Sequence, residues 1–188
     1  MKKLKDKVKG KLKKKRFLHT EGVVDTAVEL CKIYGIDGQK AILAGYLHDY
    51  TKYMKKDEIL EIVKREKIKL NEVEKHNLFL VHGYTAAVVA RDEFAISDEE
   101  VLDAIRYHTF GRVNMTILDM IMYVADAIEP EREYDGIEQL RKLAKKDIEK
   151  AYLMALEHSI KYVIDKNQMI HPNSIESRNA ILMKNTEE

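Results

Sequence analysis

Helical spacing of apolar residues runs through almost the whole chain and is seldom interrupted. The 188 residues include only two prolines and eight glycines, too few breakers to suggest the many turns of a β architecture. Apolar side chains recur three or four positions apart, as at Val23, Ala27 and Leu30. No stretch outside the lysine-rich residues 1–15 shows strand-like alternation or an internal repeat. We therefore predict an all-α protein, a single helical bundle.

Start and stop signals divide this pattern into separate helices. The predicted helices cover residues 16–34, 38–52, 56–65, 77–93, 114–129 and 137–166, with a last short helix through Met183. A further helix is expected between 93 and 114: Ser97 and Glu100 form a capping box at its start, and Gly111 ends it. The segment 137–166 reads as one long helix or as a pair broken near Lys146. Residues 66–76 are expected to form a polar connection.

Positive charge is concentrated at the start of the chain. Residues 1–16 contain ten Lys or Arg and one Asp, a net +9, whereas residues 17–188 contain 23 basic and 31 acidic side chains, a net −8. Leu4, Val8 and Leu12 suggest a weakly amphipathic helix over residues 2–15. We divide the chain into a basic leader helix, residues 1–15, and one domain, residues 16–188. The leader is interpreted as a solvated helix, and an arm for RNA, ribosomes or a membrane surface is the alternative.

The composition also bears on the compartment. No apolar run approaches the roughly 20 residues that cross a bilayer, and the first 16 residues lack a secretory core. Cys31 is the only cysteine, which excludes an internal disulfide framework. We expect a cytoplasmic protein without a membrane partner. The sequence leaves open whether it forms a homodimer.

Isolated polar residues interrupt the apolar faces of five predicted helices. These residues are His19, the dipeptide His48-Asp49, His82, His108 and Asp126. A single inward histidine is usually satisfied by a nearby carbonyl, and a single inward aspartate by an ion pair. Several such groups in one small bundle are costly to bury without compensation, and a shared cluster of divalent ions would compensate them all. Imidazole and carboxylate ligands suit iron, manganese, cobalt, nickel or zinc, and the lack of thiolates argues against a structural zinc site.

The words around these residues resemble a known family. They are RFLHTEGV at 16–23, AGYLHDYTK at 44–52, HGYTAA at 82–87, AIRYHTFGR at 104–112, YVADAIEPER at 123–132 and IHPNSIESRN at 170–179. The series is similar to the H…HD…H…H…D signature of HD-superfamily phosphohydrolases. Together the words resemble the bacterial symmetric bis(5′-nucleosyl)-tetraphosphatase family over residues 16–183.

The resemblance implies an activity and a set of site residues. The family cleaves diadenosine tetraphosphate at its centre into two ADP molecules, by a metal-activated hydroxide at a dinuclear site, with iron as the expected metal. The implied metal ligands are His19, His48, Asp49, His82, His108 and Asp126, with Asp49 and Lys52 in catalysis. The implied nucleotide contacts are Arg16, Asp49, Lys52, His82, His108, Thr109, Arg132, Ile170, His171, Ser174 and Ile175.

Two residues depart from the family pattern, and two other functions stay open. Phe110 replaces a small hydroxylic residue, and Ala127 replaces a larger or polar one; both concern the fit of the substrate. His76 and His158 have no partners in the pattern and are expected to lie on the surface. The first alternative is an HD phosphohydrolase for another nucleotide, such as a deoxynucleotide monophosphate or a guanosine alarmone. The second is a nucleic-acid-binding protein that uses the basic leader.

Overall fold

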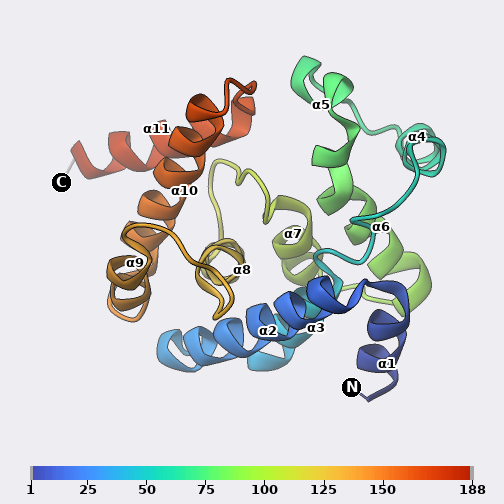
Figure 1. Ribbon diagram of the computed structural model, residues 1–188, viewed down its shortest axis with the longest axis horizontal. Coiled ribbons are helices and arrows are strands. Elements are labelled where there is room, and N and C mark those ends of the chain that lie inside the picture. Colours follow the sequence, from blue (N-terminus) through green and yellow to red (C-terminus); the bar gives the residue numbers. More distant parts are fainter. Residues whose placement is uncertain (1, 187–188) are drawn as a thin grey trace.

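The computed structural model describes residues 2–186, and this part of the chain is a bundle of helices with no strand (Figure 1). The elements are α1 (Lys2–Lys11), α2 (Lys14–Tyr34), α3 (Gly38–Leu47), α4 (Lys56–Arg65), α5 (Glu72–His76), the 3₁₀ helix η1 (Leu78–Val81), α6 (His82–Phe94), α7 (Glu99–Tyr107), α8 (Ile117–Ile128), α9 (Ile137–Ala144), α10 (Ile148–Asp165) and α11 (Pro172–Thr186). The all-α prediction is confirmed. Within the described residues, no helix combines the length and apolar character that crossing a membrane requires.

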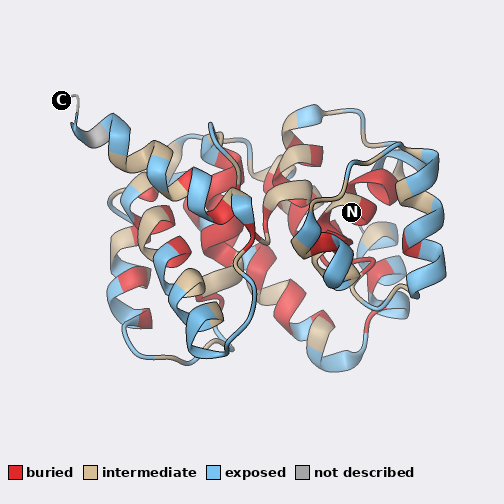
Figure 2. Cartoon of the chain, turned by 90° about the horizontal axis from the view of Figure 1, so that it is seen from above, coloured by how far each residue is buried: buried red, intermediate tan, exposed pale blue. Residues whose placement is uncertain are grey.

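The core lies where α2, α3, α7 and α8 meet. Helix α8 packs against α2, α7 and α10, and α2 also packs along α3. Buried residues line the inner side of each helix, whereas exposed residues cover the outer side (Figure 2). Helices α4 to α6 extend the bundle on one flank of α7, and α9 to α11 extend it on the other flank of α8 (Figure 1). Helix α8 is therefore the central element.

Two glycines allow helices that later contribute to the site to approach closely. A Cβ atom on Gly45 of α3 would lie 2.7 Å from Cγ2 of Val24 on α2. A Cβ atom on Gly83 of α6 would lie 2.5 Å from the carbonyl oxygen of Arg106 on α7. Both distances are shorter than van der Waals contact allows, so a larger residue at either position would separate the two helices.

Several predicted helix bounds agree with the structure. Helix α4 has the predicted range, and the segment 137–166 is a pair of helices that break at Lys145–Asp147. Helix α2 ends at Gly35, which adopts a left-handed conformation with φ 68° and bonds back to the carbonyl oxygen of Cys31.

Other bounds were predicted wrongly. Helix α3 ends at Leu47 rather than at Lys52, and consecutive turns follow it. The connection expected at 66–76 contains α5, and the helix expected from residue 77 starts with the 3₁₀ turn η1. Asp98, not Ser97, caps α7, because its carboxylate accepts from the backbone N–H of Glu100.

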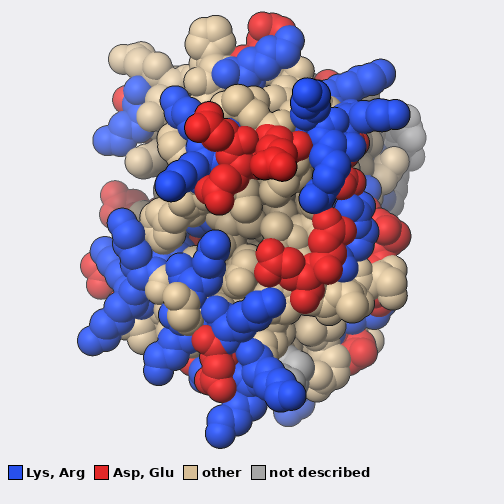
Figure 3. Space-filling view, turned by 90° about the vertical axis from the view of Figure 1, so that its right-hand side faces the viewer, with Lys and Arg blue, Asp and Glu red and all other residues tan. Residues whose placement is uncertain are grey.

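The lysine-rich segment is packed on one side. Helix α1 ends at Lys11, two residues separate it from the start of α2 at Lys14, and it contacts α2 and α3. Val8 is fully buried and Leu12 is 7% exposed, while the lysines of α1 are exposed. Lys and Arg side chains crowd the lower part of the face in Figure 3, where α1 lies. Helix α1 thus has a buried apolar edge and a basic outer surface. The single helix predicted over residues 2–15 is wrong, because the chain breaks at residues 12–13 and Lys14 already belongs to α2.

Candidate metal centre

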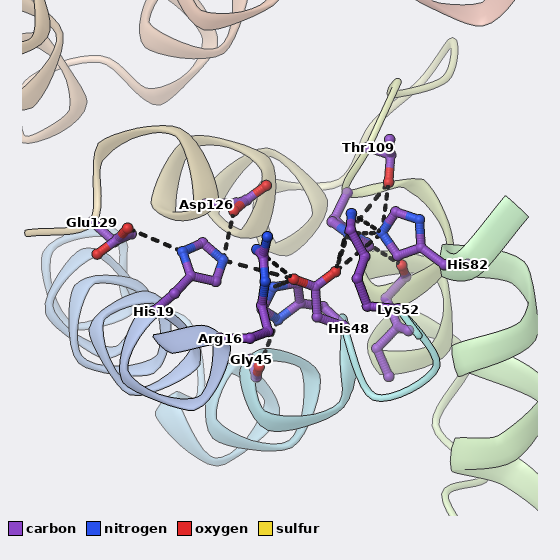
Figure 4. A network of polar contacts seen from close by, with 12 residues as sticks. Arg16, His19, Gly45, His48, Lys52, His82, Thr109, Asp126 and Glu129 are labelled. Atoms are coloured by element: carbon purple, nitrogen blue, oxygen red, sulfur yellow. Dashed lines mark hydrogen bonds and ion pairs between the residues drawn. The ribbon is translucent and has the colours of Figure 1, made fainter. Parts of the chain in front are cut away.

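Six inward polar residues meet at the centre of the bundle (Figure 4). His19 comes from α2, His82 from the start of α6 and Asp126 from α8, whereas His48 and Asp49 follow α3 and His108 follows α7. All but Asp126 are buried, and the side chain of Asp126 is 25% exposed. The helix packing therefore brings together the whole set of ligand positions that the resemblance implies.

The carboxylate of Asp49 lies in the middle of this cluster. Its Oδ1 is 3.1 Å from Nε2 of His82 and 3.9 Å from Nε2 of His108. Its Oδ2 is 3.4 Å from Nε2 of His48 and 3.8 Å from Nε2 of His19. The two oxygens thus face different pairs of imidazoles, which is an arrangement that suits a carboxylate shared by two ions.

Three of the histidines are oriented by the same local contact. His48, His82 and His108 each come directly after the last residue of a helical turn, in α3, η1 and α7 respectively. In each, Nδ1 lies within 2.6–2.8 Å of the carbonyl oxygen three residues earlier. Carbonyls at a helix end lack a continuing backbone donor, so they are free to accept from the Nδ1–H. This bond leaves Nε2 as the unprotonated nitrogen, aimed at the centre.

His19 is oriented by a different element. Its Nδ1 lies 3.0 Å from Oε1 of Glu129, which is 1% exposed, and its Nε2 lies 3.0 Å from Oδ1 of Asp126 (Figure 4). The other oxygen of Glu129 accepts from the backbone N–H of Glu131. Sequence reasoning missed Glu129, although it stands three positions after Asp126 and so lies near it on a helical surface.

The cluster fits a metal by its unsatisfied atoms and its donor types. Nε2 of His19, Nε2 of His48 and Oδ1 of Asp49 are buried and have no hydrogen-bond partner among the described residues. Two overlapping groups could each hold an ion, with ligand atoms within 4.8 Å of one another. They are His19, His48 and Asp126, and His48, Asp49 and His108. Nitrogen and carboxylate oxygen donors are those that divalent first-row metals accept.

The carboxylates at this centre are held in the ionised form. Burial acts to raise the pKa of Asp49, but the charge and close contact of His48, together with the contact of His82, keep it well below its usual value. Burial likewise opposes ionisation of Asp126, whose pKa the close contact with Nε2 of His19 holds well below the usual value. Both side chains are therefore available as anionic ligands.

The imidazoles divide into two kinds. Burial lowers the pKa of His82, and burial together with the nearby His48 and His82 holds the pKa of His108 well below its usual value. For His48 burial acts in the same direction, but the carboxylates of Asp49 and Asp126 outweigh it and raise the pKa. Neutral imidazole is the form that binds metal, and the excess of negative charge around His48 favours a cation at its Nε2.

Three basic side chains border the cluster. Nη1 of Arg16 lies 2.8 Å from Oδ2 of Asp49, and Nζ of Lys52 lies 3.5 Å from its Oδ1. Nη2 of Arg132 lies 3.0 Å from Oδ1 of Asp126. Lys52 stands in the turns after α3, not one helical turn beyond His48 as its predicted helix implied. All three cations nevertheless face the ligand carboxylates.

Two cavities adjoin the cluster. The first, of about 360 Å³, is bounded by His108, Thr109 and Asp126 and extends between α8 and α10. The second, of about 460 Å³, is bounded by Arg16 and His19. Among the residues that the structure describes, Arg132 is the single one common to both walls. Ala127, one of the two departures from the family pattern, lines the first cavity, where a small side chain leaves room.

Residues 170–175 support the loop that follows His108. The ring of His171 stacks on Phe110 with centroids 3.7 Å apart, and Oγ of Ser174 donates to the carbonyl oxygen of Phe110 at 3.0 Å. Phe110 is 3% exposed and lines neither cavity, so this departure acts on loop packing. Ile170 is partly buried, and Ile175 is 37% exposed.

Two histidines without a role in the pattern were expected at the surface. Both His76 and His158 are exposed. His158, however, also borders the first cavity and stacks on Tyr134 with centroids 4.2 Å apart. No signal in the sequence distinguishes it from an ordinary surface residue, because its cavity forms between α10 and segments far away along the chain.

Comparison with known proteins agrees with this geometry. The HD domain family model matches residues 16–131. A solved structure described as a predicted HD superfamily hydrolase involved in NAD metabolism, from Clostridium acetobutylicum, superposes with a TM-score of 0.93. It is 43% identical, and the match covers 97% of each chain. The fold and the site thus define an HD-domain protein.

Two bacterial relatives narrow the assignment. The symmetrical bis(5′-nucleosyl)-tetraphosphatase of Bacillus subtilis is 40% identical over 93% of this chain and 94% of its own. The protein of the same name from Halalkalibacterium halodurans is 41% identical over 94% of both chains. Within the HD domain proteins, this chain therefore belongs to the symmetrical bis(5′-nucleosyl)-tetraphosphatase family.

Proposed function

We propose that the protein hydrolyses diadenosine tetraphosphate symmetrically into two ADP molecules at a centre that holds two divalent metal ions. The observation that carries the proposal is the convergence of four imidazole Nε2 atoms on the two oxygens of Asp49. The names of the two relatives supply the substrate.

The ions would be held by the six residues of the cluster. His19, His48 and Asp126 would provide one set, and His82, His108 and the remaining oxygen of Asp49 would complete the other. Iron is the metal we expect, and the nitrogen and oxygen donors also suit manganese, cobalt, nickel or zinc. When bound, such ions lower the pKa of water and neutralise charge on phosphoryl oxygens.

The chain itself would position the polyphosphate. In the transition state negative charge spreads over the phosphoryl oxygens and builds up on the leaving ADP, and preorganised cations around these atoms stabilise it. Arg16 and Lys52 lie at Asp49, and Arg132 lies at Asp126, so all three can turn to phosphate oxygens once metal neutralises the carboxylates. Fixing the central phosphorus among these groups removes much of the entropic barrier.

One nucleoside would occupy the first cavity. Tyr134 and Tyr162 offer aromatic faces there, and Thr109 offers a hydroxyl beside the centre. Residues 170–175 pack on the loop that carries Thr109, so they hold it in position and would border the nucleotide.

The proposal is tested by metal analysis together with a substrate panel. Purified protein loaded with iron, manganese or cobalt should release ADP from diadenosine tetraphosphate, and chelation should abolish the release. A deoxynucleotide monophosphate and a guanosine tetraphosphate serve as the competing substrates. Faster release of phosphate or pyrophosphate from either of these would reassign the substrate. Absence of metal binding and of hydrolysis under all conditions would end the proposal.

A further inference from the structure

The second cavity has chemistry that the metal centre does not use. It lies beside His19 and extends outward along Lys13, Lys15 and Tyr53. Its volume of about 460 Å³ is within the usual range for small-molecule sites. None of these three outer residues was singled out by the sequence pattern.

The walls of this cavity match the parts of a nucleotide. Lys13 and Lys15 are exposed and stand with Arg16 on the side of the cluster. The ring of Tyr53 is half exposed, so a flat partner can reach it, and Nζ of Lys13 lies 4.8 Å from its centroid. Leu18, 48% exposed, adds an apolar surface. Cations for phosphate and an aromatic face for a base are therefore present in one cavity.

Tyr53 is also tied to the phosphate-facing side of the site. Arg16 and Tyr53 line this same cavity, and Nη1 of Arg16 lies 2.8 Å from Oδ2 of Asp49. The guanidinium thus stands between the cluster and the cavity that the aromatic residue borders. Glu131 lies on the same wall and is exposed, and its carboxylate suits ribose hydroxyls rather than phosphate.

Symmetric cleavage sets a geometric requirement. If the broken bond is the central one, two identical nucleoside diphosphate halves must extend away from the cluster in different directions. Two cavities with separate walls, joined only at Arg132, provide two such directions. A single cavity would accommodate one half and leave the other in solvent.

We propose that the cavity at Lys13, Lys15 and Tyr53 binds the second nucleoside diphosphate half of the substrate. Tyr53 stacks on its base, and the two lysines contact its phosphates. The inference rests on the proposed function and assigns a role to the end of the lysine-rich leader. It makes Tyr53 a determinant of the preference for dinucleotides over mononucleotides.

The experiment compares two substrates with the same phosphate chain. Diadenosine tetraphosphate has two nucleosides, and adenosine 5′-tetraphosphate has one. In Tyr53→Ala, kcat/KM for the dinucleotide should fall roughly 10-fold, the size expected from losing one base–aromatic stack. For the mononucleotide it should stay unchanged. The double variant Lys13→Ala/Lys15→Ala should lower kcat/KM for both substrates, because both carry the phosphates that the lysines contact. Ile164→Ala, similarly exposed but outside both cavities, should change neither value.

Equilibrium binding gives a second readout. By calorimetry the metal-loaded wild-type protein should bind two ADP per chain, and Tyr53→Ala should bind one. One ADP per wild-type chain, or an equal change for both substrates in Tyr53→Ala, would overturn the inference while leaving hydrolysis itself intact. Failure of the wild-type protein to release ADP would instead count against the proposed function.

Discussion

Leu47 and His48 are neighbours in the chain, and both are fully buried, yet they belong to two different kinds of interior. Leu47 is part of a continuous apolar core that joins α2, α3, α7 and α8. His48 belongs to a polar centre in which buried nitrogen and oxygen atoms lack hydrogen-bond partners among the described residues.

The difference concerns what each interior tolerates. Apolar contacts have no direction, so a core retains its fold when side chains of similar volume are exchanged. A polar centre depends on orientation, because each imidazole must present a particular nitrogen. The apolar core should therefore govern unfolding, and the polar centre should govern activity.

The largest separation between the two regions is expected at Asp49. In Asp49→Asn the shape is kept, but the charge that the two proposed ion positions would share is lost. We expect turnover to fall by about 100- to 1,000-fold or more, as when a group that stabilises transition-state charge is removed. Circular dichroism should remain that of the wild-type protein. Turnover close to wild type would show that Asp49 does not bridge the ions.

The core should give the opposite result. Leu30 lies on α2 eleven residues after His19, is 1% exposed and belongs to the apolar core. Leu30→Ala should lower the free energy of unfolding by about 2–5 kcal/mol, because it removes buried surface and leaves a cavity. Turnover measured at a temperature well below the melting temperature should stay close to that of the wild-type protein. Denaturant unfolding and initial rates measure both, and a large loss of rate without a loss of stability would contradict the division.

A smaller effect should follow from a residue that acts through a ligand. Glu129→Gln keeps an acceptor for His19 but removes the charge behind it. We expect metal affinity to fall roughly 10-fold, at the lower end of what loss of such outer contacts costs. Chelator competition measures the affinity, and Glu176→Gln, exposed on α11, is the matched control. Equal affinity in both variants would limit Glu129 to packing.

The smallest effect is expected at a carboxylate outside both regions. Asp147 caps α10 by accepting from the backbone N–H of Lys150, and that bond lowers its pKa. Asp147→Ala should cost about 1 kcal/mol of unfolding free energy at neutral pH.

The cost should depend on pH with a definite sign. Because the pKa is lower in the folded state, the stabilisation is complete above the unfolded value near 4 and is lost as pH falls through the folded value. Thermal unfolding at about pH 7 and about pH 3 tests this. If the stability difference between the wild-type protein and Asp147→Ala is as large at about pH 3 as at about pH 7, the effect of the substitution comes from helix propensity and not from the charged cap.

The helices could be predicted wherever local signals agree with packing. Helix α4 and the break between α9 and α10 follow from periodicity, and the left-handed Gly35 ends α2 as expected. The end of α3 could not be predicted. Residues 48–56 contain no glycine or proline that would mark the end of the helix. The chain turns there because tertiary contacts, such as the hydrogen bond from Thr51 to the carbonyl oxygen of His82, stabilise the turn.

Within the site, residue types could be predicted but partners could not. Histidines on otherwise apolar helix faces can be recognised from the sequence, because a polar residue at such a position is unusual unless it has a function. No sequence pattern distinguishes Glu129 or the cavity residues Lys13 and Tyr53. Glutamates, lysines and tyrosines are common on protein surfaces, so their presence alone does not predict a role in the site. Their positions depend on how α1, α2 and the turns after α3 meet, which is a property of the packed bundle.

The repeated contact from Nδ1 to the carbonyl three residues earlier has a consequence for how the centre can change. The carbonyl oxygen three residues earlier orients the imidazole ring of each of His48, His82 and His108. The orientation of each ring is therefore set locally, whereas the distances between the rings are set by the spacing of the helices. Substitutions at Gly45 or Gly83, whose Cα atoms lie where two helices approach closely, would alter that spacing. Substitutions at the contacts between helices can therefore change which ion such a bundle prefers, without a mutation of any proposed ligand residue.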